Sequence, residues 1–240
     1  MDEQNQPQKA PYVMPIYPTL TREEIIKADD ARINAVTDEL RQGFRLIEQH
    51  PKSVTFYGSA RFPKGSMWYE KARRIAHALS QKGYSIVTGG GPGIMEAAHE
   101  GGFEANGKTV GLNIHLPSEQ KVNPFAKESV EFKYFFTRRV ALSFAAEAYL
   151  FFPGGFGTLD EFYELVTLVQ TRRIPPVPLI CVGSEFWTPF DEIHKNKLLA
   201  QYNAISPGDE KVYEILDNEE DIVRIVAAEP VRNGIVFPHA

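Results

Sequence analysis

The chain has 240 residues, 43% of them hydrophobic, and a formal net charge of −5. This length and apolar content suit one large domain, or one domain with an appendage. The charges are interspersed, without the basic block of a nucleic-acid-binding face, and no run reaches the roughly 18 apolar residues of a membrane span. We therefore expect neither nucleic acid nor membrane as a partner.

Two further features bear on the compartment. The first residues, MDEQNQPQK, lack a basic start and an apolar run, so we expect no secretory signal. Cys181 is the only cysteine, which rules out an intrachain disulfide and suits a reducing environment. We expect a cytoplasmic protein. The six histidines are scattered without ligand spacing, so we predict no metal, and we predict no cofactor.

The N-terminal part divides into an arm and a helix. Residues 1–20 contain four prolines among polar residues, which predicts a flexible arm. Thr21-Arg-Glu-Glu24 is a capping box, at which a helix should start. Apolar residues then recur at three- and four-residue steps as far as Ile47, so we predict an amphipathic helix over 21–50. Its apolar face must pack on the domain or on a partner subunit.

Residues 51–230 alternate short apolar runs with helical segments, and 231–240 form a tail. The predicted strands are Val54–Tyr57, Tyr84–Val87, Thr109–Ile114, Val130–Phe135, Ala148–Phe152, Val177–Val182 and a short one near Val212–Leu216. The predicted helices are Tyr69–Gln81, Ile94–Ala105, Thr137–Ala146, Thr158–Arg172, Phe186–Tyr202 and Glu219–Ala228. This alternation predicts an α/β fold: a Rossmann-like open parallel sheet with helices on both faces, plus the N-terminal helical extension.

Three predicted turns between a strand and the next helix are rich in glycine. Such turns lie together at the carboxyl edge of a parallel sheet, where ligands bind. Glycine lets the backbone approach an anion closely, and a helix N-terminus offers free N–H groups and a partial positive charge. We therefore predict a phosphate site, although glycines can also serve tight turns alone. Its candidate residues are Gly58, Ser59, Gly89, Gly90, Gly91, Gly93, Met95, Gly154, Gly155, Gly157 and Thr158.

Two nucleotide motifs are disfavoured. The dinucleotide fingerprint fails because Ile94 stands where its third glycine should follow Gly91, and no acidic residue ends the next strand. The segment from Gly102 to Thr109 matches the Walker A spacing. A true P-loop follows a strand and opens a helix, whereas here a helix comes before the segment and a strand follows it. We expect neither NAD binding nor triphosphate hydrolysis.

Charged residues flank the proposed phosphate site. Glu161 stands three residues after Thr158, so the two could form a capping box and nothing more. If Thr158 and the glycine N–H groups hold phosphate, Glu161 would instead face the attached ribose. Arg138 and Arg139 follow the fourth predicted strand, and spacing alone does not choose between them.

Two segments carry a family resemblance. Gly89-Gly-Gly-Pro-Gly-Ile-Met-Glu-Ala-Ala98 and Pro153-Gly-Gly-Phe-Gly-Thr-Leu-Asp-Glu161 resemble the paired signatures of the LONELY GUY family, the cytokinin riboside 5′-monophosphate phosphoribohydrolases. The likeness runs from about Ser53 to Val182, with weaker support to Ala228. Its members were formerly labelled lysine decarboxylases, but no lysine here has a context that marks a pyridoxal phosphate Schiff base.

The resemblance implies a catalytic pair. Aligning on Pro153 places the family's arginine at Arg138 and its glutamate at Glu161. Where plant members carry Glu-Arg-Lys, this chain reads Thr137-Arg138-Arg139. The proline-rich arm and the N-terminal helix are similar to those of the longer bacterial members. Assembly among relatives, with the apolar Val166 to Val169 segment and the first helix as candidate contacts, suggests a homodimer.

These observations lead to one functional hypothesis and one alternative. The hypothesis is hydrolysis of a nucleoside 5′-monophosphate, AMP or N6-modified AMP, to free base and ribose 5-phosphate. The alternative is a non-catalytic nucleotide-binding or carrier protein on the same scaffold, which needs the glycine turns but not Glu161. Met95, Glu96 and Asn113 are candidates for the lining of the base pocket.

Overall fold

The computed structural model describes residues 21–115, 122–229 and 231. The predicted arm at 1–20, and the predicted tail apart from residue 231, lie outside the described residues. By its internal contacts the chain divides into two compact units, residues 1–35 and 36–240. The domain limits drawn from the sequence stay predictions.

The predicted N-terminal helix is present as α1, Arg22–Glu48. It begins at the expected capping box. The backbone N and Oγ1 of Thr21 donate to Oε2 of Glu24 at 2.8 and 2.9 Å, and the backbone N of Glu24 donates back to Oγ1 of Thr21 at 3.3 Å. Residues 36–48 of this helix belong to the larger unit.

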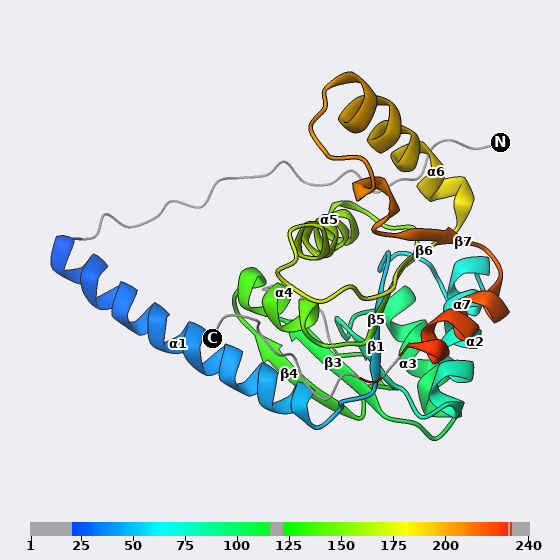
Figure 1. Ribbon diagram of the computed structural model, residues 1–240. Coiled ribbons are helices and arrows are strands. Elements are labelled where there is room, and N and C mark those ends of the chain that lie inside the picture. Colours follow the sequence, from blue (N-terminus) through cyan, green and yellow to red (C-terminus); the bar gives the residue numbers. More distant parts are fainter. Residues whose placement is uncertain (1–20, 116–121, 230, 232–240) are drawn as a thin grey trace, which may run out of the picture. The chain divides into compact units, whose positions relative to one another are not determined.

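A parallel seven-stranded sheet forms the centre of the larger unit (Figure 1). Its strands are β1 (Ser53–Tyr57), β2 (Ser85–Thr88), β3 (Thr109–Ile114), β4 (Glu128–Phe132), β5 (Ala148–Phe151), β6 (Leu179–Val182) and β7 (Glu214–Leu216). Every neighbouring pair is parallel. The predicted fold class is therefore confirmed.

The strand order is β4-β3-β2-β1-β5-β6-β7. The chain winds outwards from β1 to β4, then returns to the other side of β1 and continues to β7. The order thus reverses between β1 and β5, and the turns that follow these two strands flank the crevice where ligands bind in open α/β sheets.

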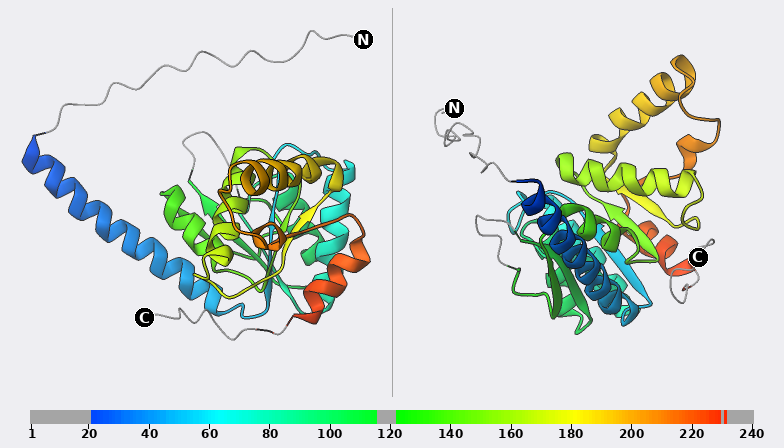
Figure 2. Two further views of the ribbon diagram at one scale, coloured as in Figure 1. Left: turned by 45° about the horizontal axis from the view of Figure 1, so that its top comes forward. Right: turned by 90° about the vertical axis from the view of Figure 1, so that its left-hand side faces the viewer.

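Alternate residues of each strand face opposite layers. In β1, Val54 and Phe56 join one apolar cluster, whereas Tyr57 joins the other. The first cluster lies under α2 (Met67–Gln81), α3 (Ile94–Glu104) and α7 (Glu219–Ala228). The second lies under residues 36–48 of α1, α4 (Phe135–Ser143), α5 (Phe156–Gln170) and α6 (Ser184–Ile193), as Figure 2 shows from two further directions. Cys181 is buried in this second layer.

Several element boundaries differ from the predictions. β4 ends at Phe132 rather than Phe135, because its ladder with β3 stops where Ile114 pairs with Phe132. The chain can then turn early, and α4 begins at Phe135 rather than Thr137. The long helix predicted near 186–202 is α6 followed by a π-helix over His194–Gln201. A 3-10 turn over Asp209–Lys211 precedes β7.

Two further findings bear on segments considered in the sequence. Within the described ranges, no helix combines the length and apolar character that crossing a bilayer requires. The Walker-like segment, residues 102–109, begins in the last turn of α3, which ends at Glu104, and ends at Thr109, the first residue of β3. A strand follows it instead of a helix, as the sequence indicated.

Candidate active site

Backbone hydrogen bonds of Ser59 join the three glycine turns. The N–H of Ser59 donates to the carbonyl of Pro153 at 3.1 Å, and the carbonyl of Ser59 accepts from the N–H of Ile94 at 3.1 Å. A Cβ on Gly93 would lie only 2.4 Å from that carbonyl, and Gly93 has a φ of +69°, so the position requires glycine. The turns after β1, β2 and β5 therefore meet at one edge of the sheet, as predicted.

The turn after β5 leads directly into α5. The helix begins at Phe156 with Gly155 as its N-cap, so Thr158 lies in the first helical turn. The predicted capping box of Thr158 and Glu161 is therefore wrong. A Cβ on Gly154 would lie 2.2 Å from Oγ1 of Thr158, whereas a Cβ on Gly155 or Gly157 would meet nothing within 4 Å. Open space thus adjoins a helix N-terminus whose first N–H groups lack intrahelical partners, an arrangement that favours an anion.

Arg138 reaches this edge from α4. Its Nε donates to the carbonyl of Leu112, within β3, at 2.8 Å. Its guanidinium lies against the second glycine turn, since a Cβ on Gly89 would stand 2.0 Å from Nη2. Its Nη1 lies 3.9 Å from Oε1 of Glu161 on α5. The structure thus brings the predicted arginine and glutamate together beside the Gly89 to Gly93 turn.

Arg139 makes a different set of contacts. Its Nη1 donates to both carboxylate oxygens of Asp160, at 2.8 and 2.6 Å. Its Nε lies 3.4 Å from Oε2 of Glu164. Arg139 therefore ties α4 to α5, and Arg138 is the arginine that contacts the glycine turn.

Glu161 has a raised proton affinity. Burial raises its pKa to about 7; the nearby Arg138 acts in the opposite direction, and the carboxylates of Asp160 and Glu164 add to the increase. Burial, with Glu161 as a second cause, also raises the pKa of Tyr57 on β1. A carboxyl group with a pKa near neutrality can accept or donate a proton at physiological pH.

A buried polar network, not anticipated from the sequence, supports the second glycine turn. The N–H of Gly90 donates to Oγ1 of Thr88 at 2.8 Å. Asn123 donates from its backbone N to the carbonyl of Gly90 at 2.8 Å and from Nδ2 to the carbonyl of Gly91 at 3.1 Å. These bonds fix the path of the turn.

His99 completes that network from α3. Its Nε2 lies 3.1 Å from the carbonyl of Val110 and donates to it, so Nδ1 accepts from Nδ2 of Asn123 at 3.1 Å. Burial lowers the pKa of His99 to about 4, which keeps the ring neutral. The only sequence signal was a histidine on an otherwise small and apolar helix face.

The residues predicted to line the base pocket divide into two groups. Sδ of Met95 would lie 2.9 Å from a Cβ on Gly89, and Oδ1 of Asn113 would lie 1.7 Å from a Cβ on Gly90. Asn113 is buried, and among the described residues its Oδ1 has no hydrogen-bond partner. Glu96 instead lies 3.4 Å from the hydroxyl of Tyr69. Met95 and Asn113 therefore adjoin the glycine turn, whereas Glu96 contacts a residue of α2.

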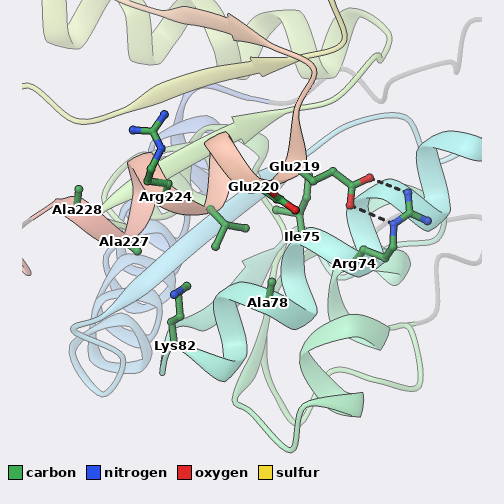
Figure 3. Close-up of a pocket in the computed structure, with 10 residues that line it drawn as sticks. Arg74, Ile75, Ala78, Lys82, Glu219, Glu220, Arg224, Ala227 and Ala228 are labelled. Carbon is green, nitrogen blue, oxygen red and sulfur yellow. Dashed lines mark hydrogen bonds and ion pairs between the residues drawn. The ribbon is translucent and has the colours of Figure 1, made fainter.

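A separate surface cavity of about 520 Å³ lies between α2 and α7 (Figure 3). Apolar side chains such as Ile75 and Val223 line it, and Arg74 at its rim forms a two-bond ion pair with Glu219 at 3.1 and 2.7 Å. None of the predicted site residues lines this cavity. Over the described parts of the chain, no group of three or more histidine, cysteine or acidic residues could hold a metal.

Comparison with known families decides the membership of this chain. Residues 95–226, more than half of the chain, match the family model described as "possible lysine decarboxylase". The chain belongs to this family, the LONELY GUY family. The resemblance seen in the two glycine signatures is confirmed.

The relatives of this LONELY GUY family member include named enzymes. It is 31% identical over 158 residues to a cytokinin riboside 5′-monophosphate phosphoribohydrolase of rice, Oryza sativa subsp. japonica, which covers 63% of this chain and 61% of the relative. It is 26% identical over 161 residues to a pyrimidine/purine nucleotide 5′-monophosphate nucleosidase of Escherichia coli K12, which covers 62% of this chain and 35% of the relative. The chain thus spans only part of the length of both.

Solved structures show the same fold. A crystallised structural-genomics target matches with a TM-score of 0.54 and 25% identity, over 73% of this chain and 98% of that protein. A molybdenum cofactor binding protein from Rippkaea orientalis matches with a TM-score of 0.51 and 19% identity, over 72% and 93%. At that identity the second likeness concerns the fold alone.

Proposed function

We propose that this protein hydrolyses the N-glycosidic bond of a nucleoside 5′-monophosphate, AMP or N6-modified AMP, and releases the base and ribose 5-phosphate. The observation that carries the proposal is the 3.9 Å approach of Arg138 to Glu161 beside the Gly89 turn. The rice and E. coli relatives, both named for action on nucleoside monophosphates, support it.

The 5′-phosphate binds at the start of α5. The N–H groups of its first turn, with Gly154, Gly155, Gly157 and Thr158, face the phosphate, and the Gly89 to Gly93 turn closes the opposite side. Fixing this remote group supplies binding energy that orients the sugar for reaction. A monophosphate is therefore preferred over a nucleoside.

Glu161 and Arg138 act on the ribose and the base. The bond from C1′ to the base nitrogen breaks with its electron pair on the base, and positive charge develops on the ribose. The ionised carboxylate of Glu161 stabilises that charge and takes a proton from the attacking water, whose oxygen bonds to C1′. The departing base takes up one proton, so the net reaction adds one water. Arg138 holds the phosphate or assists the departure of the base.

Decarboxylation, the activity in the description of the family model, receives no support from this site. A pyridoxal phosphate enzyme binds its cofactor through a lysine Schiff base. Four charged side chains have the largest effect on the pKa of Glu161: Arg138, Asp160, Glu164 and Arg139. None of these four is a lysine. We therefore propose hydrolysis without a cofactor.

The decisive experiment is incubation with AMP, GMP, CMP and an N6-prenylated AMP, with chromatographic detection of the free base. We expect release from at least one, and the pattern identifies the preferred base. Glu161→Gln should retain monophosphate binding while turnover falls by about 10²–10⁴, the usual contribution of a general acid or base. If no substrate releases its base, the enzyme proposal fails and a nucleotide carrier replaces it. Unchanged turnover in Glu161→Gln would assign the glutamate a structural role only.

We also propose a homodimer. Phe156 at the start of α5 is 92% exposed, and Phe135 and Phe136 at the start of α4 are 59% and 47% exposed. Exposed apolar side chains of this size are typical of protein interfaces. Val166 and Val169, which the sequence also suggested, are half-buried against the core of the monomer, and their part in a dimer contact stays a prediction. Sedimentation of the wild type and of Phe156→Ser tests this, and a wild-type monomer at micromolar concentration would refute it.

A further inference from the structure

Helix α4, which carries Arg138, has no capping side chain of its own. Its N-cap is Tyr134, whose side chain makes no capping hydrogen bond. The carboxylate of Glu39, on α1, takes that place. Its Oε1 accepts from the N–H of Lys133 at 2.9 Å, and its Oε2 accepts from the N–H of Tyr134 at 3.4 Å and from Oγ1 of Thr137 at 2.6 Å.

This contact is buried and adjoins the proposed catalytic arginine. Glu39 is 8% exposed and Thr137 is fully buried, and Arg138 is the next residue along the chain. A carboxylate at a helix N-terminus bonds free N–H groups and interacts favourably with the helix dipole. Because these bonds are charged and shielded from water, they are stronger than neutral ones.

A second close contact lies between the same two helices. Gly43 lies one turn after Glu39, and a Cβ there would stand 2.8 Å from Cζ of Phe132 and 3.2 Å from Cβ of Ala141. The second half of α1 thus contacts the chain just before α4 and also the second turn of α4. The position of α4 along its own axis is set by contacts with a helix that lies 98 residues earlier in the sequence.

We propose that Glu39 is a positioning residue for Arg138: its carboxylate fixes the start of α4, and with it the distance between the guanidinium and Glu161. The proposal rests on the proposed function, in which these two side chains act on the substrate. Glu39 lies outside the residues matched by the family model. Helix α1 therefore contributes to the active site as well as to the fold. A displacement of about 1 Å at a reacting group can cost about 10²-fold in rate.

The test compares Glu39→Gln with the control Asp38→Asn. Asp38 is the neighbouring carboxylate, with a 64% exposed side chain that pairs with Arg41 on the same helix. We expect Glu39→Gln to lower kcat for AMP at least 10-fold and Asp38→Asn to leave it unchanged. We also expect the acid limb of the kcat profile to move to higher pH, because Arg138 withdraws from Glu161. Of the other groups that act on the pKa of Glu161, Asp160 and Glu164 on α5 and Tyr57 on β1 keep their places. Arg139 lies on α4 and moves with Arg138, and because it also lowers that pKa its displacement shifts the limb in the same direction.

A double-mutant cycle identifies the route of the effect. In an Arg138→Met background, Glu39→Gln should cause no further loss of the residual turnover. An equal loss in both backgrounds would overturn the proposal, as would an unmoved acid limb, because a general weakening of the fold gives those results. Glu39→Gln is used rather than Glu39→Ala because the amide keeps one acceptor oxygen for the N–H groups before α4, so the variant should still fold.

Hydrogen exchange separates failure of this inference from failure of the proposed function. Glu39→Gln should speed exchange at the amides of Lys133 and Tyr134, while Asp38→Asn should not. A wild type that releases no base from any monophosphate, together with faster exchange in Glu39→Gln, refutes the function and keeps the anchoring of α4. Unchanged exchange overturns the role of Glu39 whatever the activity.

Discussion

Removing the charge of Arg138 should shift the pH dependence of catalysis. The proposed active form of Glu161 is ionised, and its pKa of about 7 leaves roughly half of the molecules in that form at neutral pH. Turnover should therefore rise with pH through 7 and level off above it. A cation stabilises a carboxylate, so Arg138→Met raises the pKa of Glu161 and moves the rising limb to higher pH.

The size of the shift follows from the geometry. Two unit charges 3.9 Å apart interact by up to about 4 kcal/mol at the effective dielectric constant of about 20 that suits such sites. That energy corresponds to as much as ~10³-fold in the acid dissociation constant. At pH 7 the ionised fraction, and with it turnover, would fall by up to the same factor, in addition to any direct role of Arg138.

The assay is base release from AMP between pH 5.5 and about 10.5, the upper bound being set by the expected shift of the limb. Arg139→Met is the matched control, since Arg139 lowers the pKa of Glu161 less than Arg138 does and pairs directly with Asp160. We expect a small displacement of the limb in the control and a large one in Arg138→Met. A limb that stays at the wild-type pH in Arg138→Met, however low the rate, would refute the coupling of the two groups.

Two further predictions concern the second glycine turn. Gly89→Ala should cut kcat about 10²-fold, because the new Cβ would stand 2.0 Å from Nη2 of Arg138 and displace it. In an Arg138→Ala background the same substitution should lower kcat little. An equal loss of kcat in that background would contradict the displacement of Arg138 as the cause. The buried His99 ring binds a proton less tightly in the folded protein than in the unfolded chain. Its contribution to the free energy of unfolding is therefore fully present above pH 6.5 and falls by about 3 kcal/mol as the pH drops towards 4. Urea unfolding at pH 7 and 4.5 measures this loss, and His99→Asn should lack that part of it.

The parallel sheet, and the edge of the sheet at which the candidate site lies, could be predicted from the sequence alone. Short apolar runs such as Tyr149 to Phe152 have the pattern of strands buried on both faces, and the structure places alternate residues of β5 in the two layers. Glycine turns after such strands can only gather at the carboxyl edge. The convergence of three of them was therefore predictable without any knowledge of strand order.

The side-chain pairing at the site was not predictable from local spacing. Arg138 and Arg139 are adjacent, and only the positions of Asp160 and Glu161 on α5 show which arginine approaches which carboxylate. The capping box expected at Thr158 failed because Gly155, three residues earlier, is already the N-cap of the helix. The hydrogen bonds of Lys133 and Tyr134, just before α4, go to Glu39, a long-range partner that no pattern near Phe135 could reveal.

Cys181, the one cysteine of the chain, lies wholly inside the layer between the sheet and its helices, and burial raises the pKa of its thiol well above the usual range. Only the thiolate reacts readily with alkylating reagents, so the folded protein should be inert to maleimides. A cysteine introduced on the surface, for instance in place of Tyr202, which is 68% exposed, would then be the single reactive thiol without further changes to the chain. Fluorescent dyes or spin labels could be attached there, and slow labelling of Cys181 in the wild-type chain would report the fraction of molecules that unfold.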